Sequence, residues 1–258
     1  MHQPNPVDPL SAPARGVRSA GAWRSGVLVF GLCGLLVGGC DSEAIEQPPD
    51  AASLQIDPVL QQTEVWCWAA TVEMVLRHFG LPNLNEGGNY QCGVVAVYAL
   101  VRYGAGHPCT FDCRECEEPI NGMPAIEALV EQYGREARRA GLSSPILSAA
   151  SVPRRLTALE LMREIAGGSP VVAAVSFDGT AFPEANDHVV VLTAYSTSSD
   201  GTFLTVNDPY PYDRFAPASE NPYIGAGGRS LGAGQYEIEL QAFAARFGWA
   251  GSLYRIRG

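Results

Sequence analysis

The chain has 258 residues, a formal net charge of −10, and 47% hydrophobic against 17% charged residues. That length and composition suit a domain with its own core and exclude a disordered polar segment, and the acidic balance argues against nucleic-acid binding. All 17 basic residues are arginine. Because lysine is absent, Schiff-base chemistry and a Walker-type phosphate loop are excluded.

The N-terminus has the pattern of an export signal. Three arginines within the first 25 residues precede an apolar run that ends at Cys40, and this run is shorter than the about 20 apolar residues of a membrane-spanning helix. The Val-Gly-Gly sequence before Cys40 resembles the lipobox of bacterial lipoproteins, which implies that Cys40 carries a lipid at the membrane of the bacterial cell envelope. An ordinary signal peptide or an uncleaved anchor is the alternative.

Cleavage before Cys40 would remove residues 1–39 as the signal peptide. That segment holds three Arg and one Asp, so the formal charge of the remaining chain would be −12. Residues 40–56 are polar and acidic and contain Pro48 and Pro49, which predicts a flexible tether. Residues 57–258 show no internal repeat and no second linker, and we expect them to form one domain.

Helical patterns come first in that domain. We predict a helix over Trp66–Phe79 that Gly80 ends, a short helical patch over Val94–Arg102, and a helix over Pro124–Tyr133 followed by Gly134. Thr157 and Glu160 form a capping-box pattern that opens another helix, ending at Gly167. His78, in the last turn of the first helix, is expected to be structural.

Strand patterns follow the helices. The β-rich runs are Val171–Phe177, His188–Tyr195 and Thr202–Asn207, with further candidates at Gln235–Leu240 and Ser252–Ile256. Helices followed by antiparallel strands indicate an α+β fold.

Cys67 stands at the very start of the first predicted helix. Backbone N–H groups and the helix dipole at a helix start stabilise an anion, so a thiol there ionises more easily. A thiolate is the nucleophile that peptide-bond chemistry needs. The alternative is an inert buried cysteine or one half of a disulfide.

Three further residues suit such a thiolate. Gln61 lies six residues before Cys67, and its amide could join the Cys67 backbone N–H in binding a developing oxyanion. His188 begins one predicted strand, and Asp208 follows the end of the next. A short hairpin brings two such strand ends together, so that the carboxylate can orient the imidazole.

These stretches resemble papain-like cysteine peptidases, in particular the compact bacterial branch that includes bacteriocin-exporter peptidase domains and cysteine-protease effectors of plant pathogens. The matching motifs are Gln-x5-Cys at Gln61 and Cys67, Trp-Cys-Trp-Ala-Ala, the His-Val-Val-Val strand at His188 and the Val-Asn-Asp-Pro sequence at Asp208. The resemblance implies that Cys67 is the nucleophile and His188 the general base and later acid. It further implies that Asp208 orients His188 and that Gln61 is the oxyanion donor. The implied fold has N-terminal helices, with the cysteine at a helix start, packed on a C-terminal antiparallel sheet.

For the oxyanion donor and for the residue that orients His188, an adjacent residue in the sequence could take the same role. Gln62 adjoins Gln61 and would face the site if the register shifted by one residue. Asn207 adjoins Asp208, and larger papain relatives use Asn as the orienting residue. We favour Gln61 and Asp208.

Four more cysteines, Cys92, Cys109, Cys113 and Cys116, fall between the first helix and the helix that starts near Pro124. In an exported domain they would form two disulfides, with three possible connectivities. The rival is a zinc site, because Cys113-x2-Cys116 with Cys109 and His107 has ligand-like spacing. Either arrangement leaves Cys67 unpaired, as a nucleophile requires.

The sequence therefore predicts an exported, lipid-anchored cysteine peptidase that acts on peptide or protein substrates, with no metal or organic cofactor and no nucleic-acid partner. The alternatives are another Cys–His acyl-transfer enzyme, of transglutaminase or amidase type, and a catalytically silent papain-like binding protein. Loops over 178–187 and 210–234 are expected to set specificity. The second is long and rich in Gly, Pro and Tyr, as in a lid or a plain surface insertion.

Overall fold

A computed structural model of the chain describes residues 47–120, 122–176, 188–212 and 220–258, which belong to one compact unit, Glu46–Gly258. The predicted signal peptide, the predicted lipid site Cys40 and the predicted specificity loop 178–187 lie outside the described residues. Among the described helices, none has both the length and the apolar character needed to cross a lipid bilayer.

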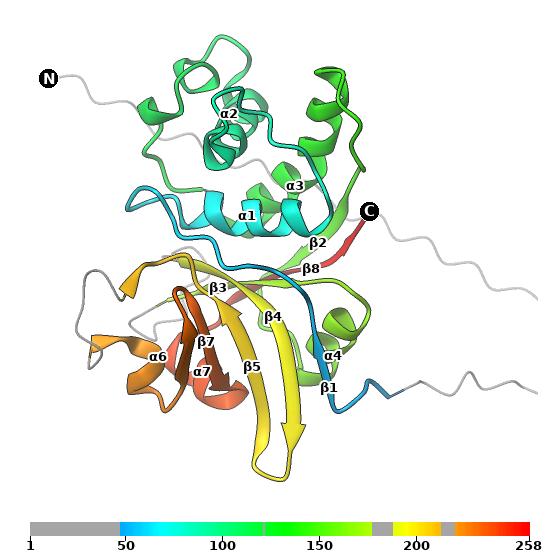
Figure 1. The fold of residues 1–258 in the computed structure, drawn as a ribbon, viewed down its shortest axis with the longest axis vertical. Coiled ribbons are helices and arrows are strands. Elements are labelled where there is room, and N and C mark those ends of the chain that lie inside the picture. The colour runs from blue at the N-terminus through cyan, green and yellow to red at the C-terminus, as the bar shows by residue number, and fades with distance from the viewer. Residues whose placement is uncertain (1–46, 121, 177–187, 213–219) are drawn as a thin grey trace, which may run out of the picture. The chain divides into compact units, whose positions relative to one another are not determined.

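The first half of the unit is helical. It contains α1 (Cys67–His78), α2 (Tyr90–Tyr103), two short 3-10 turns (Pro108–Thr110 and Cys113–Glu115) and α3 (Gly122–Arg139). Figure 1 shows these helices grouped on one side of the strands. The predicted first helix is confirmed, and it ends where Gly80 takes a φ of +71°, a conformation that suits glycine. Every residue of α1 from Trp68 to Leu76 is buried, because the helix lies between α2, α3 and the sheet.

The two other helices of this half are longer than predicted. The patch expected from Val94 starts at Tyr90, because the Asn89 side chain caps the helix and accepts from the Cys92 N–H. The helix expected to stop at Gly134 continues to Arg139. A Cβ at Gly134 would lie 2.1 Å from the Pro145 carbonyl oxygen, so the glycine permits close backbone packing and does not end the helix.

The second half is an antiparallel sheet with strand order β2-β8-β3-β4-β5-β7-β6, and β1 pairs with β4 off this path. The strands are β1 (Ala51–Ser53), β2 (Ser148–Val152), β3 (Val171–Val175), β4 (His188–Ser198), β5 (Gly201–Asn207), β6 (Arg229–Gly232), β7 (Gln235–Glu239) and β8 (Gly251–Arg257). All five predicted strands are present.

The described residues of this half also form three short helices: α4 (Ala158–Ala166), α6 (Pro222–Gly225) and α7 (Leu240–Arg246). The predicted capping box of α4 is confirmed. The Thr157 side chain accepts from the Glu160 N–H, and the Glu160 carboxylate accepts from the Thr157 N–H. The segment 210–234 carries α6 and β6 within its described part.

The prediction of a flexible tether over residues 40–56 is wrong for residues 51–53, which form a strand. Strand β1 pairs with Ala194–Ser196 of β4, beside the part of β4 that lies past its pairing with β3 at Leu192. The Tyr195 hydroxyl also donates to the Pro49 carbonyl oxygen at 2.8 Å. Because β4 extends beyond β3, it leaves a free edge on which the incoming chain adds a short strand, and the folded unit begins before residue 57.

Strand β3 explains how the halves join. Its alternate residues Val172 and Ala174 pack toward α1, α2 and α3, whereas Val171, Ala173 and Val175 pack into a second core. Both faces of the strand are buried, which is why its sequence is apolar throughout. The predicted α+β fold, with N-terminal helices packed on a C-terminal antiparallel sheet, is confirmed.

Candidate active site

Cys67 is the first residue of α1, and its side chain is half-buried. It is the one free cysteine among the described residues. At this position the first backbone N–H groups of the helix have no partner within the helix. The predicted placement of a free thiol at a helix start is confirmed.

The β4–β5 hairpin brings His188 and Asp208 together as expected. His188 opens β4, Asp208 follows the last residue of β5, and the strands pair up to Val191 opposite Asn207. His188 Nε2 lies 2.6 Å from Asp208 Oδ1, and both side chains are buried. Helix α1 packs against β4, and the Thr71 hydroxyl donates to the Val189 carbonyl oxygen at 3.1 Å. This packing places Cys67 within hydrogen-bonding reach of His188.

The imidazole of His188 is held between an acid and a thiol. Burial disfavours its charged form, but the charge and hydrogen bond of Asp208 and the hydrogen bond and charge of Cys67 outweigh burial and raise the pKa of His188 to about 10. Since Asp208 engages Nε2, Nδ1 is the ring nitrogen that can face the thiol. The environment therefore stabilises an imidazolium next to Cys67.

Gln61 lies in the same cleft as Cys67 and His188. Its backbone N–H donates to the Pro209 carbonyl oxygen at 2.8 Å, which ties it to the residue after Asp208. Its side-chain Nε2 donates to the carbonyl oxygens of Thr63 (2.8 Å) and Glu64 (3.0 Å). Its Oε1 is buried without a partner among the described residues. If the Gln61 side-chain N and O were exchanged, the amide oxygen would face two carbonyl oxygens and make no hydrogen bond. The amide hydrogens therefore bind the Thr63 and Glu64 carbonyls in this conformation.

The two neighbouring alternatives point elsewhere. Gln62 is exposed, and its Oε1 accepts from Asn89 at 2.6 Å. The Asn207 amide donates to the Ile56 carbonyl oxygen, and its Oδ1 accepts from Gln235, both at 2.8 Å. Among the described residues Asp208, and not Asn207, contacts His188, and Gln61, and not Gln62, lines the cleft beside Cys67.

The cleft beside the thiol has a volume of about 190 Å³ and is mainly apolar. Its apolar lining comes from Val65, Trp68, Pro119, Ile120, Ile126 and Val189. Glu64, Gln61 and the His188–Cys67 pair supply the polar end. Such a lining suits an apolar group placed next to the reactive thiol.

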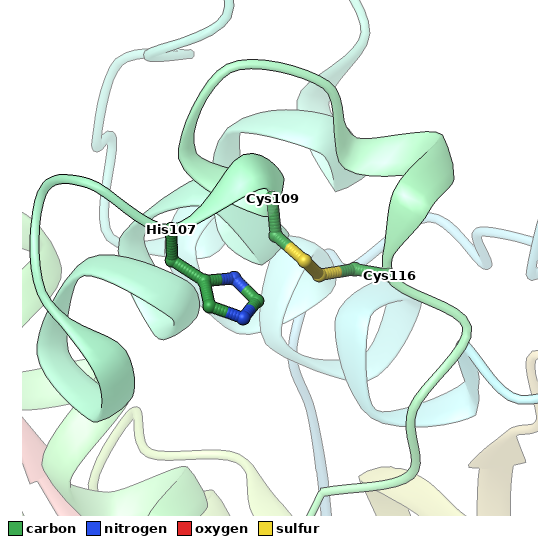
Figure 2. Close-up of side chains that lie close together, drawn as sticks. All are labelled: His107, Cys109 and Cys116. Carbon is green, nitrogen blue, oxygen red and sulfur yellow. A yellow bond between two sulfur atoms is a disulfide. The ribbon is translucent and has the colours of Figure 1, made fainter.

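The four clustered cysteines are paired as Cys92–Cys113 and Cys109–Cys116. Figure 2 shows the imidazole of His107 beside the second disulfide, and ligand atoms of these three residues lie within 4.8 Å of one another. A sulfur in a disulfide is not a thiolate ligand, so the zinc alternative would require this bond to be reduced. The structure describes two disulfides here, which was the favoured expectation.

The disulfide-linked segment is bound to the residues that flank Cys67. The Trp66 indole N–H donates to the Cys116 carbonyl oxygen at 2.7 Å, and that of Trp68 donates to the Glu118 carbonyl oxygen at 3.2 Å. Residues 117–120, which we call the cleft wall, then run along the apolar side of the cleft, where Ile120 lines it. We therefore expect the disulfides to help position the residues that line the cleft.

Two contacts to Asp208 have no counterpart among the sequence motifs. The Tyr210 backbone N–H donates to Oδ1, and the Tyr223 hydroxyl donates to Oδ2, each at 2.8 Å. The Tyr210 ring also stands edge-on to the His188 ring, with centroids 6.5 Å apart. Tyr223 lies in a segment without strong periodicity, and no motif in the sequence links it to Asp208.

His78 has a contact that suits its predicted structural role. Its Nε2 lies 3.0 Å from the Gly168 carbonyl oxygen.

Comparison with known proteins gives one family. Residues 53–224, more than half of the chain, match the Peptidase_C39 like family. None of the curated proteins matches the sequence.

Among solved structures, a double glycine motif protease from an AMS/PCAT transporter in complex with the leader peptide is similar, with 15% identity, a TM-score of 0.38, and coverage of 81% of this chain and 96% of that chain. The digestive procathepsin L 3 of Tenebrio molitor larval midgut is 13% identical, with a TM-score of 0.47 and coverage of 81% and 70%. Bromelain from Ananas comosus is 14% identical, with a TM-score of 0.35 and coverage of 80% and 98%.

Proposed function

Because this chain belongs to the Peptidase_C39 like family, a family of cysteine peptidases, we propose that it hydrolyses peptide bonds with Cys67, His188 and Asp208. The resemblance to papain-like cysteine peptidases predicted from the sequence is confirmed at the level of the family. The observation that carries the residue assignment is the buried His188–Asp208 pair next to the thiol, with the pKa of His188 raised to about 10.

In the first step the Cys67 thiolate attacks the carbonyl carbon of the peptide bond, and the electron pair of the C=O bond moves to the oxygen. The backbone N–H of Cys67 at the helix start stabilises this oxyanion. The His188 imidazolium then gives its proton to the departing amine, the C–N bond breaks, and an acyl-thioester remains.

In the second step neutral His188 takes a proton from water, and the resulting hydroxide attacks the thioester. The C–S bond breaks, the carboxylic acid product leaves, and Cys67 returns as thiolate beside the imidazolium. Asp208 keeps the imidazole oriented through both steps. Gln61 joins as a second oxyanion donor if its amide leaves the Thr63 and Glu64 carbonyls when substrate binds.

Alkylation of Cys67 tests the assignment directly. With iodoacetamide as the probe, the wild type should react well below pH 8, Cys67→Ala should not react at that site, and His188→Ala should react only near the ordinary thiol range of about 8.5. A wild-type profile with the ordinary thiol range would refute the paired nucleophile. Hydrolysis assays should then show free-acid products, since products formed only by transfer to an added amine would indicate a transglutaminase-like reaction.

The orienting residue has its own matched pair of variants. We expect Asp208→Ala to abolish peptidase activity and Asn207→Ala to retain it. The opposite result would assign the orienting role to Asn207.

We further propose that the enzyme is exported and anchored by a lipid on Cys40. The support is the basic, apolar and small-residue pattern before Cys40, together with two disulfides, which persist in oxidising compartments. Metabolic labelling with a fatty-acid probe should mark the wild type and not Cys40→Ala. Equal labelling of both would refute lipidation at this residue.

A further inference from the structure

The carboxylate of Asp208 is fixed by a separate donor on each oxygen. Oδ1 accepts from His188 Nε2 at 2.6 Å and from the Tyr210 N–H at 2.8 Å. Oδ2, the oxygen that does not contact His188, accepts from the Tyr223 hydroxyl at 2.8 Å. Asp208 is fully buried, and within the described residues Tyr223 is the one donor to Oδ2.

We propose that Tyr223 is a positioning residue that fixes the plane of the Asp208 carboxylate and, through it, the His188 ring. The proposal rests on the proposed function. The terminal torsion of an aspartate is broad, so a carboxylate anchored through one oxygen can rotate about its Cβ–Cγ bond. An anchor on the second oxygen restricts that rotation, which keeps Oδ1 aimed at Nε2 and the opposite ring nitrogen aimed at the thiol.

Tyr223 is itself held rigidly. Its side chain is fully buried, and its ring stacks on Tyr236 with centroids 4.2 Å apart and contacts the Phe247 ring in a tilted arrangement with centroids 4.5 Å apart. Its backbone N–H donates to the Asn221 side chain at 3.0 Å. A donor held by buried ring contacts and a backbone hydrogen bond can impose a geometry on its acceptor, whereas a mobile donor would follow it.

The hydroxyl is also a permanent donor. Burial and the charge of Asp208 raise the pKa of Tyr223 well above its ordinary value, so the phenol stays protonated. Among the described residues, the titratable groups around Asp208 are His188 with Cys67 beyond it, Tyr210 against the His188 ring, Tyr223, Tyr236 stacked on Tyr223, and Tyr212, whose pKa is raised by burial and by Asp208 and which also senses the Arg246 charge. The Tyr223 and Tyr212 phenols therefore keep their protons in the range where His188 titrates.

Tyr223→Phe removes the hydroxyl and keeps the stacked ring, and Tyr236→Phe is the matched control because it deletes a hydroxyl from the same buried stack. For Tyr223→Phe we expect a kcat about tenfold or more lower with an unchanged KM, since Tyr223 does not belong to the described cleft lining. Tyr236→Phe should keep wild-type kcat and KM.

The pH profile separates positioning from general destabilisation. A carboxylate that rotates holds the imidazolium less well, so in Tyr223→Phe the alkaline limb of activity should move to lower pH. A limb that does not move, or that moves up, would overturn the proposal even if kcat falls. In an Asp208→Asn background, Tyr223→Phe should cause no further loss, and an additive loss would also overturn it.

Alkylation of wild-type Cys67 and the kinetics of Tyr223→Phe together separate the role of Tyr223 from that of the triad. If wild-type Cys67 shows no alkylation below the ordinary thiol range, the triad itself is refuted. If the wild type shows that reactivity and Tyr223→Phe matches its profile and its kcat, only the role of Tyr223 is refuted. Should Tyr223→Phe not fold, Asn221→Ala loosens Tyr223 but keeps its hydroxyl, and it must then give a smaller change in the same direction or the proposal fails.

Discussion

Opening the Cys109–Cys116 disulfide tests whether the disulfides shape the cleft. The bond closes a short loop with a sequence separation of 7, whereas Cys92–Cys113 has a separation of 21. Loop-closure entropy of the unfolded chain gives about 2 kcal/mol of stabilisation for the first and about 3 kcal/mol for the second. Replacing both cysteines of the shorter loop with alanine should therefore cost less stability than replacing both of the longer one.

The functional effect should follow the opposite order. The shorter loop ends at Cys116, whose carbonyl oxygen accepts a hydrogen bond from the Trp66 indole N–H. The cleft wall starts at the next residue. Once that disulfide is removed, residue 116 loses its covalent link to residue 109, and residues 117–120 are held by hydrogen bonds alone, from Trp66 to the carbonyl oxygen at position 116 and from Trp68 and Tyr103 to Glu118. We expect a higher KM for peptides with an apolar side chain, a kcat close to wild type, and no change in the alkylation profile of Cys67.

The assay combines urea unfolding of both double variants with steady-state kinetics, without added reductant. A larger stability loss for the Cys109–Cys116 variant would refute the loop-entropy reasoning. An unchanged KM in that variant, with the protein folded, would refute the inference that this disulfide shapes the cleft.

Three further perturbations, a rise in pH and two substitutions, test other parts of the structure. With the pKa of His188 raised to about 10, the imidazolium is present below that value and lost above it, so activity should fall as pH rises through about 10. In Asp208→Asn any residual activity should lose its alkaline limb nearer the ordinary histidine value of about 6.5, and a pH–rate profile that keeps the wild-type limb would contradict the pairing. Gly134→Ala should lower the free energy of unfolding by about 1–3 kcal/mol, because the new Cβ would meet the Pro145 carbonyl oxygen at 2.1 Å. Equal or greater stability in urea would contradict that contact.

Local sequence patterns are sufficient to locate the main parts of the site. A helix start at Cys67 follows from the apolar stripe after it, and a strand start at His188 follows from the valines behind it. The hairpin between β4 and β5 is short, so Asp208 has to return close to His188. These predictions succeed because each depends on chain neighbours or on one tight turn.

The predictions that fail concern packing between distant segments. Gly134 has the sequence pattern of a helix stop, yet α3 passes through it because the Pro145 backbone needs the space. Residues 51–53 have the composition of a tether, yet they form β1 because β4 extends beyond β3. In both cases a long-range contact overrides a local preference.

The order of the reactive groups, the α+β class and the cysteines available for disulfides can be read from the amino-acid sequence. The pairing of the cysteines, the turn of the Gln61 amide to the Thr63 and Glu64 carbonyls, and the Tyr223 bond to Asp208 become visible only in the folded chain. Helix starts, strand periods and short turns are set by residues a few positions apart. A hydrogen bond or disulfide between separate segments depends instead on how the whole core packs, and no local pattern encodes that packing.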